Sequence, residues 1–327
     1  MGIKSKNVLI TTGDRDGIGL EVTEKALLKI GMQKGVHFLV WRSPISFPRN
    51  LKRLNKKFNV RSFTNPQHAF NFLLSKEMNS KTLLEIVSEA SPAVWVETSA
   101  RWCLDDRVHG MVTAPMSKLE IQTSGMTDMG HTDILKRIAQ TQDVFMGFLG
   151  SQFSALLATA HLPIENVTKS LTPDLLRKAL LAANSLRQML PKKFQSRPIG
   201  ILGLNPHAGE SGMIGDSESR LFPELLNFAK KSKILASGPL VPDAAFLKDQ
   251  WKKYSVYVAM YHDQGLIPFK LVHGQDVGVH ISVGLPFLRT SVDHGTAKDI
   301  FGKNKANPSS MCDAIQTCLR LDKSSIR

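Results

Sequence analysis

The sequence has no apolar run near the ~20 residues that a membrane-spanning helix needs. Its first residues, MGIKSKNVLITTG, lack the apolar core and the cleavage site of a signal peptide. Cysteine is scarce, and Cys103, Cys312 and Cys318 are odd in number and without metal-ligand spacing. They predict reduced thiols rather than a disulfide framework. These absences predict a cytoplasmic protein that makes no membrane contact.

Acidic residues are few beside basic ones. Lys plus Arg number 42 against 28 Asp plus Glu, which gives a net charge of +14. Between Lys25 and Lys76 there are 11 Lys or Arg and no Asp or Glu. The densest part, RNLKRLNKKFNVR, is compatible with a nucleic-acid patch or with the solvated face of a basic helix. No RNP, zinc-finger or KH signature accompanies it, so we favour the solvated face and expect no nucleic-acid partner.

Apolar segments of strand length alternate with amphipathic helical segments, which predicts an α/β protein with a mostly parallel sheet. A Gly-rich turn, TTGDRDGIG, follows the first strand and precedes a helix that stops at Gly31, but it fits neither phosphate-binding glycine motif. Thr172 and Pro173 start a second clear helix, which Pro191 stops. The 327 residues are enough for a sizeable core and two domains. The strands are expected within residues 7–12, 107–115, 154–163, 198–210 and 256–265.

Three of these strands end in a similar way. His161, His207 and His262 each come after an apolar run and are followed by turn residues. In open α/β sheets ligands bind outside the carboxyl ends of the strands, so the three imidazoles can converge on one point. Three His with an open position make a catalytic metal site, and Asp263 can complete the shell or orient a ring. Imidazole favours Zn, Co, Ni or Fe over Mg or Ca, and the sequence does not choose among them.

A second set of residues has the character of an anion site. Gly130-His131-Thr132-Asp133 precedes the helical segment DILKRIA, so Thr132 can cap a helix whose N-terminus attracts phosphate. Lys270 and Arg289 are of the residue types that bind phosphate. Each of these features alone is also typical of an ordinary protein surface.

Eight segments in collinear order resemble the 4-hydroxythreonine-4-phosphate dehydrogenase family of pyridoxal phosphate biosynthesis. They cover nearly the whole chain: TTGDRDGIGLE, TAPMSK, SGMTDMGHTD, TAHLP, GLNPHAGE, GPLVPDAAF, AMYHDQGLIPFK and GLPFLRTSVDHGTA. The resemblance implies a two-domain α/β/α fold like that of the isocitrate and isopropylmalate dehydrogenases. It places residues 1–125 and 285–327 in a discontinuous first domain and residues 126–284 in a second domain with the metal ligands and the dimer interface.

The resemblance also implies an NAD-dependent, metal-dependent homodimer with a shared active site. His161, His207 and His262 match the metal ligands, one of them supplied by the partner subunit, with Zn, Co or Mg as the ion. The other implied roles fall on three groups: substrate binding by His131, Thr132, Lys270, His280 and Arg289; cofactor binding by His294, Gly295, Thr296, Ala297 and Asn307; and proton handling by Lys118 and Asp243.

The implied reaction is oxidation of 4-phosphooxy-L-threonine to 2-amino-3-oxo-4-phosphooxybutanoate, which decarboxylates to 3-amino-2-oxopropyl phosphate. The chain departs from the family at several positions. His280 stands where the family usually has Asn, Asp133 replaces Glu, and Thr12, Arg15 and Asp16 replace the usual prolines and alanine of the first loop. Three hypotheses follow: this reaction with NAD or NADP, the same chemistry on another hydroxy acid phosphate such as a four-carbon sugar acid phosphate, and a basic RNA-associated protein on the same scaffold.

Overall fold

The computed structural model describes residues 5–44, 51–274 and 278–322. The chain divides into two compact units: unit 1 runs to Gln142 and resumes at Leu285, and unit 2 comprises Asp143–Gly284. Residues 126–142, which the sequence analysis assigned to the second domain, group with unit 1. Within the described ranges, no helix is long and apolar enough to cross a membrane.

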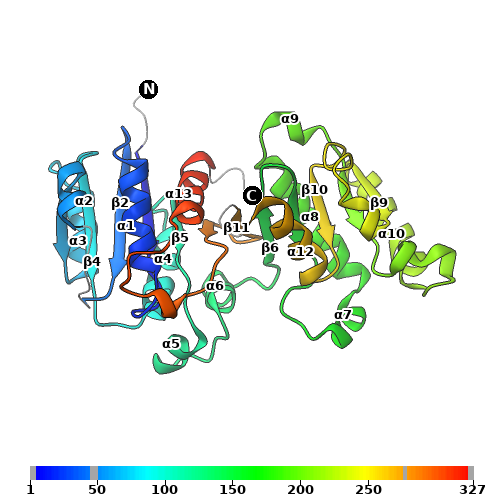
Figure 1. Cartoon of the computed structure of the whole chain (residues 1–327), viewed down its shortest axis with the longest axis horizontal. Helices are drawn as coiled ribbons and strands as arrows, with labels where there is room; N and C mark the ends of the chain where they lie inside the picture. The colour runs from blue at the N-terminus through cyan, green and yellow to red at the C-terminus, as the bar shows by residue number, and fades with distance from the viewer. Residues whose placement is uncertain (1–4, 45–50, 275–277, 323–327) are drawn as a thin grey trace. The chain divides into compact units, whose positions relative to one another are not determined.

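Unit 1 is built on a parallel sheet of six strands (Figure 1). In sheet order these are β3 (Asn59–Phe63), β4 (Thr82–Val87), β2 (Val36–Arg42), β1 (Lys6–Thr11), β5 (Gly110–Thr113) and β12 (Leu288–Ser291). Every neighbouring pair is parallel. The central strands are buried and apolar because helices cover a parallel sheet on both faces. The prediction of an α/β fold with a mostly parallel sheet is confirmed.

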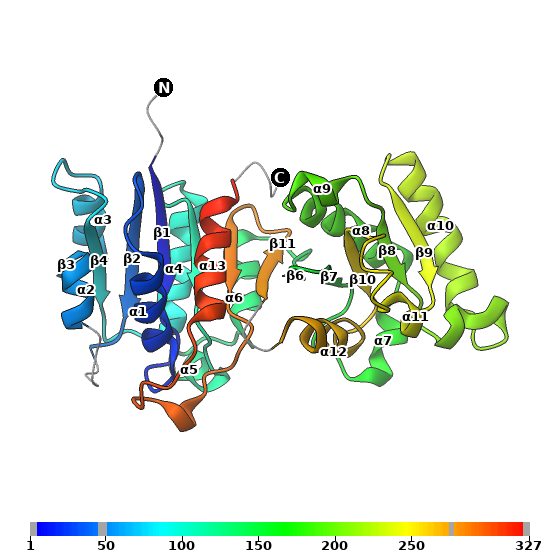
Figure 2. The same ribbon diagram turned by 45° about the horizontal axis from the view of Figure 1, so that its top comes forward.

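The helices of unit 1 connect these strands. They are α1 (Gly19–Ile30), α2 (Leu51–Lys57), α3 (Pro66–Leu73), α4 (Pro92–Leu104), α5 (Lys118–Thr123), α6 (His131–Ala139), the 3₁₀ turn η2 (Lys298–Ile300) and α13 (Ser309–Arg320). Helix α1 begins after the Gly-rich loop and ends at Gly31, as predicted. Helices α1 and α13 lie side by side against the sheet (Figure 2), so the end of the chain packs beside its beginning.

Unit 2 carries a mixed sheet of six strands. In sheet order these are β11 (Val279–Val283), β6 (Phe145–Leu149), β7 (Ser154–Leu157), β10 (Val256–Ala259), β8 (Ile199–Leu202) and β9 (Ala236–Leu240). Strand β6 is antiparallel to both β11 and β7. The other four neighbours, β7, β10, β8 and β9 in sheet order, run parallel to one another. The parallel half has all its carboxyl ends at one edge.

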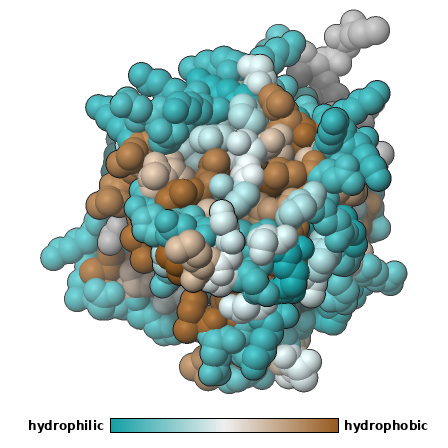
Figure 3. Space-filling view, turned by 90° about the vertical axis from the view of Figure 1, so that its right-hand side faces the viewer, coloured by the Kyte–Doolittle hydropathy of each residue, from teal (hydrophilic) through white to brown (hydrophobic). Residues whose placement is uncertain are grey.

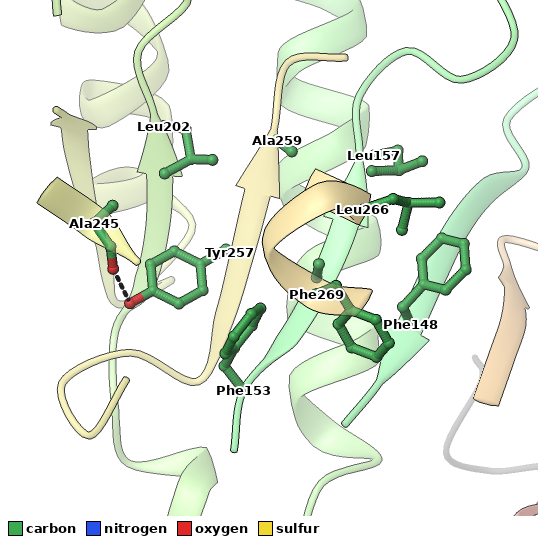
Figure 4. Close-up of a cluster of buried hydrophobic side chains, with 10 residues drawn as sticks. Phe148, Phe153, Leu157, Leu202, Ala245, Tyr257, Ala259, Leu266 and Phe269 are labelled. Carbon is green, nitrogen blue, oxygen red and sulfur yellow. Dashed lines mark hydrogen bonds between the residues drawn. The ribbon is translucent and has the colours of Figure 1, made fainter. Parts of the chain in front are cut away.

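The helices of unit 2 are α7 (Ile164–Ser170), α8 (Pro173–Gln188), α9 (Lys192–Gln195), the turn η1 (Pro206–Gly212), α10 (Ser217–Lys231), α11 (Pro242–Ala245) and α12 (His262–His273). Thr172 caps α8 by accepting a hydrogen bond from the Leu175 backbone N–H at 3.1 Å, as predicted. The core joins aromatic side chains from several elements (Figure 4). Tyr257 lies fully buried in this core and donates to the Ala245 carbonyl oxygen at 2.8 Å, which fixes β10 against α11.

A glycine is required at the first turn of unit 1. Gly13 has a φ of 66°, and a Cβ on it would overlap the Pro115 carbonyl oxygen. Gly31 has a similar φ of 71° with no atom within 4 Å of its Cβ position. We expect Gly13→Ala to lower the free energy of unfolding by about 3 kcal/mol, because left-handed strain and overlap add. Gly31→Ala should cost about 1–2 kcal/mol from backbone strain without overlap, because its φ of 71° and ψ of −169° also disfavour a side chain. Equal losses in urea unfolding would contradict the steric reason.

Candidate functional site

Two of the three predicted histidines lie together at the sheet edge of unit 2. Strands β7 and β10 are parallel neighbours, and the chain reaches His161 and His262 just after their carboxyl ends. The two imidazole rings are 5.4 Å apart between centroids. The prediction that turn residues follow His262 is wrong, because His262 is the first residue of helix α12. The N-cap of this helix is Tyr261, whose backbone is extended.

Two local features fix the His262 ring. A Cβ on Gly265 would be 2.7 Å from a Leu157 methyl carbon, so glycine lets the first turn of α12 pack closely on β7. The His262 Nδ1 atom is 2.7 Å from Asp263 Oδ1. A carboxylate on Nδ1 leaves Nε2 available as a ligand atom, which is a common arrangement behind metal-bound histidine.

His207 lies on the loop after β8, the parallel neighbour of β10 on its other side. It opens a run of five left-handed residues, from His207 with φ 51° and ψ 25° to Ser211 with φ 59° and ψ 27°. The side chain is exposed. Among the described residues, no group of three or more His, Cys, Asp or Glu side chains is placed to hold a metal ion. The structure therefore pairs two imidazoles within one chain, and the three-ligand centre stays a prediction.

Unit 1 contains a buried cationic site. Arg289 on β12 is 2% exposed. Its Nη2 and Nε atoms donate to Thr113 Oγ1, at the end of β5, at 2.7 and 3.1 Å. Burial lowers the pKa of Arg289 to about 9, which still leaves the guanidinium charged at pH 7. A buried cation is stabilised by an anionic ligand, and a guanidinium binds phosphate or carboxylate through two N–H groups. Thr113, the first residue of TAPMSK, was not among the predicted site residues.

His131 faces the same cation. Burial, and then the charge of Arg289, lower the pKa of His131 to about 3, so the ring is neutral at pH 7. Its Nε2 atom is buried and makes no hydrogen bond within the described part of the chain. His131 is also the first residue of α6, whose N-cap is Gly130 without a side-chain bond. The prediction that Thr132 caps this helix is therefore wrong. Thr132 is the second residue of the helix, in its first turn.

The lowered pKa of His131 predicts a pH-dependent stability. In the unfolded chain His131 has a pKa near 6.5, whereas in the folded chain its ring stays neutral down to about pH 3 because its pKa is lowered. Stability is therefore lost as pH falls between these values, by about 2 kcal/mol at pH 5. We expect His131→Gln, which cannot titrate, to lose less stability between pH 7 and pH 5 than the wild type. Parallel pH curves of thermal unfolding for the two proteins would contradict this prediction.

The remaining predicted residues are spread over both units. Lys118 lies on α5 in unit 1, and Asp243 lies on α11 in unit 2; both are exposed. Lys270 is half-buried in α12. His280 is 8% exposed on β11 and stacks on Phe148, with 5.2 Å between ring centroids. The imidazole that stands at the family's usual Asn position is therefore buried against an aromatic core ring.

The predicted cofactor loop is fastened to the first loop of unit 1. The Thr296 carbonyl oxygen accepts from Ile18 N at 3.0 Å, and Glu21 Oε1 accepts from Ala306 N at 2.7 Å. Lys298 pairs with Asp16 at 2.7 Å. Ala297 has a left-handed φ of 44°. The His294 Nδ1 atom lies 2.9 Å from the Gly295 carbonyl oxygen. Asn307 Oδ1 accepts from Ser309 N at 3.0 Å. The two loops therefore present one continuous surface.

Part of the basic segment is used inside unit 1. Arg42 forms a buried ion pair with Glu85 at 2.8 Å. Lys25 pairs with Glu21 at 2.8 Å. Lys57 donates to the Leu28 carbonyl oxygen at 2.6 Å. Arg49 of this segment lies outside the described residues. These contacts are structural, which weakens the reading of the segment as a nucleic-acid surface.

Comparison with known proteins was made on sequence and on fold. The family model described as pyridoxal phosphate biosynthetic protein PdxA matches residues 50–318. The chain is 32% identical over 324 residues to the 4-hydroxythreonine-4-phosphate dehydrogenase of Sulfurihydrogenibium sp. (strain YO3AOP1), covering 96% of this chain and 98% of that protein. It is 30% identical to an Oceanobacillus iheyensis protein named "Putative D-threonate 4-phosphate dehydrogenase", covering 95% of this chain and 96% of that protein.

The crystal structure of 4-hydroxythreonine-4-phosphate dehydrogenase from Klebsiella pneumoniae matches the fold with a TM-score of 0.78 at 28% identity, over 100% of both chains. Isocitrate dehydrogenase from Methylococcus capsulatus gives a TM-score of 0.52 at 12% identity, over 96% of this chain and 85% of that one, which is a likeness of fold alone. The predicted kinship of fold with the isocitrate dehydrogenases is thereby confirmed.

Proposed function

The chain belongs to the PdxA family, and from this premise we propose that it is an oxidoreductase acting on 4-phosphooxy-L-threonine in pyridoxal phosphate biosynthesis. The observation that carries the proposal is the pair of imidazoles, His161 and His262, at the carboxyl edge of neighbouring parallel strands. Ligand sites in α/β sheets lie at that edge.

In the proposed reaction the secondary alcohol is oxidised to the ketone of 2-amino-3-oxo-4-phosphooxybutanoate. NAD, when bound, would accept the hydride and so supply the chemistry that protein side chains cannot. The product is a β-keto acid, which loses CO2 to give 3-amino-2-oxopropyl phosphate. The protein's part is to hold the substrate's phosphate and hydroxyl group in position and to accept the hydroxyl proton. Lys118 and Asp243 are our candidates for this proton transfer.

The histidines fit a divalent metal in their donor chemistry. We assign His161, His207 and His262 as its ligands, one of them from the partner subunit, because three imidazoles with an open position suit a catalytic metal and the Asp263 contact at Nδ1 leaves Nε2 of His262 available. Imidazole ligands favour Zn or Co over Mg. When bound, the ion would lower the pKa of the substrate hydroxyl and stabilise the developing charge.

The phosphate of the substrate fits the cationic site of unit 1. Arg289 supplies charge from a buried position, and the neutral His131 supplies an unused ring nitrogen. The N-terminus of α6, which includes Thr132, adds backbone N–H groups. Within unit 2, Lys270 and His280 are our candidates for substrate contacts.

NAD is proposed to bind on the loop that is fastened to the Gly-rich loop. Its candidate contacts are His294, Gly295, Thr296, Ala297 and Asn307. The hydrogen bonds from Ile18 and Ala306 hold this loop in one conformation before any cofactor is bound, which lowers the cost of ordering on binding. The initial rates of substrate oxidation with NAD and with NADP decide which of the two nucleotides is used.

A homodimer with a shared active site is supported by apolar exposure beside the histidines. On α12, Ile267 and Leu271 are 65% and 84% exposed, and Leu162 and Ile164, just after His161, are 44% and 69% exposed. Figure 3 shows apolar side chains among hydrophilic ones on one face of the molecule. A second copy of the chain would remove such side chains from water. We place the enzyme in the cytoplasm, in keeping with three buried free cysteines.

A second substrate is favoured by His280 and by the D-threonate 4-phosphate named for the Oceanobacillus relative. The test is NADH formation with a panel of phosphorylated and unphosphorylated 3-hydroxy acids. We expect turnover of 4-phosphooxy-L-threonine to be the fastest. Turnover of D-threonate 4-phosphate without turnover of 4-phosphooxy-L-threonine would show that the sugar acid phosphate is the substrate. Salt-sensitive RNA binding without any NADH formation would overturn the enzymatic proposal.

A further inference from the structure

Two side chains, Thr159 and Gln264, tie together the three strand ends that lead to the histidines of unit 2. Thr159 Oγ1, two residues before His161, donates to the Met260 carbonyl oxygen at 2.7 Å. Gln264 Oε1 accepts from Met260 N at 2.7 Å. The other end of the same amide, Gln264 Nε2, donates to the Gly203 carbonyl oxygen at 2.7 Å. One amide therefore joins the end of β10, which leads to His262, to the end of β8, which leads to His207.

Glu218 fastens the next residues of the β8 loop. It lies on α10 and is 5% exposed. Its Oε1 atom accepts from the backbone N–H groups of Leu204 and Asn205, both at 2.7 Å. Its Oε2 atom accepts from Asn205 Nδ2 at 2.9 Å. A carboxylate that is buried with three donors is a rigid anchor, because removing any donor would leave it undersatisfied.

The loop needs this anchor because its backbone is strained. Five consecutive residues, from His207 to Ser211, are left-handed, and four of them are not glycine. Each of the four residues other than glycine adds about 1–2 kcal/mol of backbone strain, so the conformation persists only where its surroundings fix it. A Cβ on Gly209 would lie 2.7 Å from Glu218 Oε2, so the strained turn packs directly on the anchoring carboxylate.

We propose that Gln264 and Glu218 are positioning residues for the histidine ligands. Within each chain Gln264 fixes the segment that leads to His262 and the segment that leads to His207, and Glu218 holds the left-handed turn that carries His207. Both act through backbone groups rather than on a ligand. The inference rests on the proposed metal-binding function of these histidines.

The experiment is titration of the full-length chain with Co²⁺, followed by the visible absorption of the bound ion. Gln264→Glu keeps the acceptor for Met260 N but turns the donor to Gly203 into a repelling oxygen. Glu218→Gln replaces one acceptor oxygen with an amino group. We expect each isosteric change to weaken Co²⁺ binding roughly 10- to 100-fold and to alter the absorption spectrum. Thermal unfolding is measured for both variants, and either of them that stays folded suffices for the test.

Gln195→Glu is the matched control, because Gln195, on α9, also donates through Nε2 to backbone carbonyl oxygens, those of Gln188 at the end of α8 and of Leu190 just after it. It should bind Co²⁺ like the wild type. His262→Ala tests the premise: unchanged binding there overturns both the metal site and the positioning role. Weak binding by His262→Ala together with normal binding by Gln264→Glu and Glu218→Gln overturns the positioning role alone. An equal loss in Gln195→Glu would show a general effect and also overturn it.

Discussion

Chelation of divalent metal is expected to abolish NADH formation from 4-phosphooxy-L-threonine, and His207→Ala is expected to do the same. The metal is proposed to stabilise the negative charge that develops on the substrate oxygen, which is worth several kcal/mol of barrier. Losing it should lower kcat on the order of a thousandfold, since each 1.4 kcal/mol is a factor of ten. The measurement is the initial rate of NADH absorbance before chelation, after it, and after restoring Co²⁺ or Zn²⁺.

His68→Ala is the control for this prediction, because His68 is exposed on α3 of unit 1 and has no proposed role in the site. Its rate should equal that of the wild type. Because His207 is exposed, its truncation creates no cavity and should leave the unfolding midpoint unchanged. Activity that survives both chelation and His207→Ala would refute the assignment of the metal ligands.

Arg289→Met should lower kcat/KM about 100-fold, mainly through KM for the phosphorylated substrate. The variant removes a buried charged donor from the proposed phosphate site, and a hydrogen bond to a charged group is worth up to about 3 kcal/mol. The loss should shrink for an unphosphorylated hydroxy acid, which has no phosphate to bind. Steady-state kinetics on both substrates measure the difference.

Arg187→Met is a matched control for the removal of a buried guanidinium. Arg187 is 8% exposed on α8, and its Nη2 atom donates to Asn184 Oδ1 at 2.7 Å. We expect this variant to lose stability while keeping kcat/KM. If both arginine variants lower kcat/KM equally, or if Arg289→Met lowers it equally for phosphorylated and unphosphorylated substrates, Arg289 does not bind phosphate.

Elements with strong local signals could be predicted from the sequence. The helix from Thr172 has a capping hydroxyl, a proline at its first position and apolar spacing, and the structure shows α8 with that cap. The strand before the Gly-rich loop was expected at 7–12 and lies at Lys6–Thr11. Such signals are local because caps, proline and alternation of apolar residues act within a few positions.

Features that depend on tertiary contacts could not be predicted in this way. The start of α6 at His131 rather than beyond Thr132 depends on an extended Gly130, which a capping rule does not weigh. Likewise HDQG was read as a turn, whereas Gly265 allows a helix to pack on Leu157 there. The network through Gln264 and Glu218 joins residues 61 and 13–14 positions apart, and no periodicity in the sequence reports such pairs.

The order of the strands along the chain has a consequence for synthesis. Unit 1 is completed by β12 and α13, which follow the whole of unit 2 in the sequence. As the chain leaves the ribosome, β5 is made almost 180 residues before its neighbour β12, so one flank of β5 stays without its strand in that interval. Unit 2 can therefore finish folding first, and the Arg289 site forms only after β12, which is made after the whole of unit 2, has emerged. An interrupted translation product ending after unit 2 should bind chaperones, because its nascent first sheet has an open strand edge.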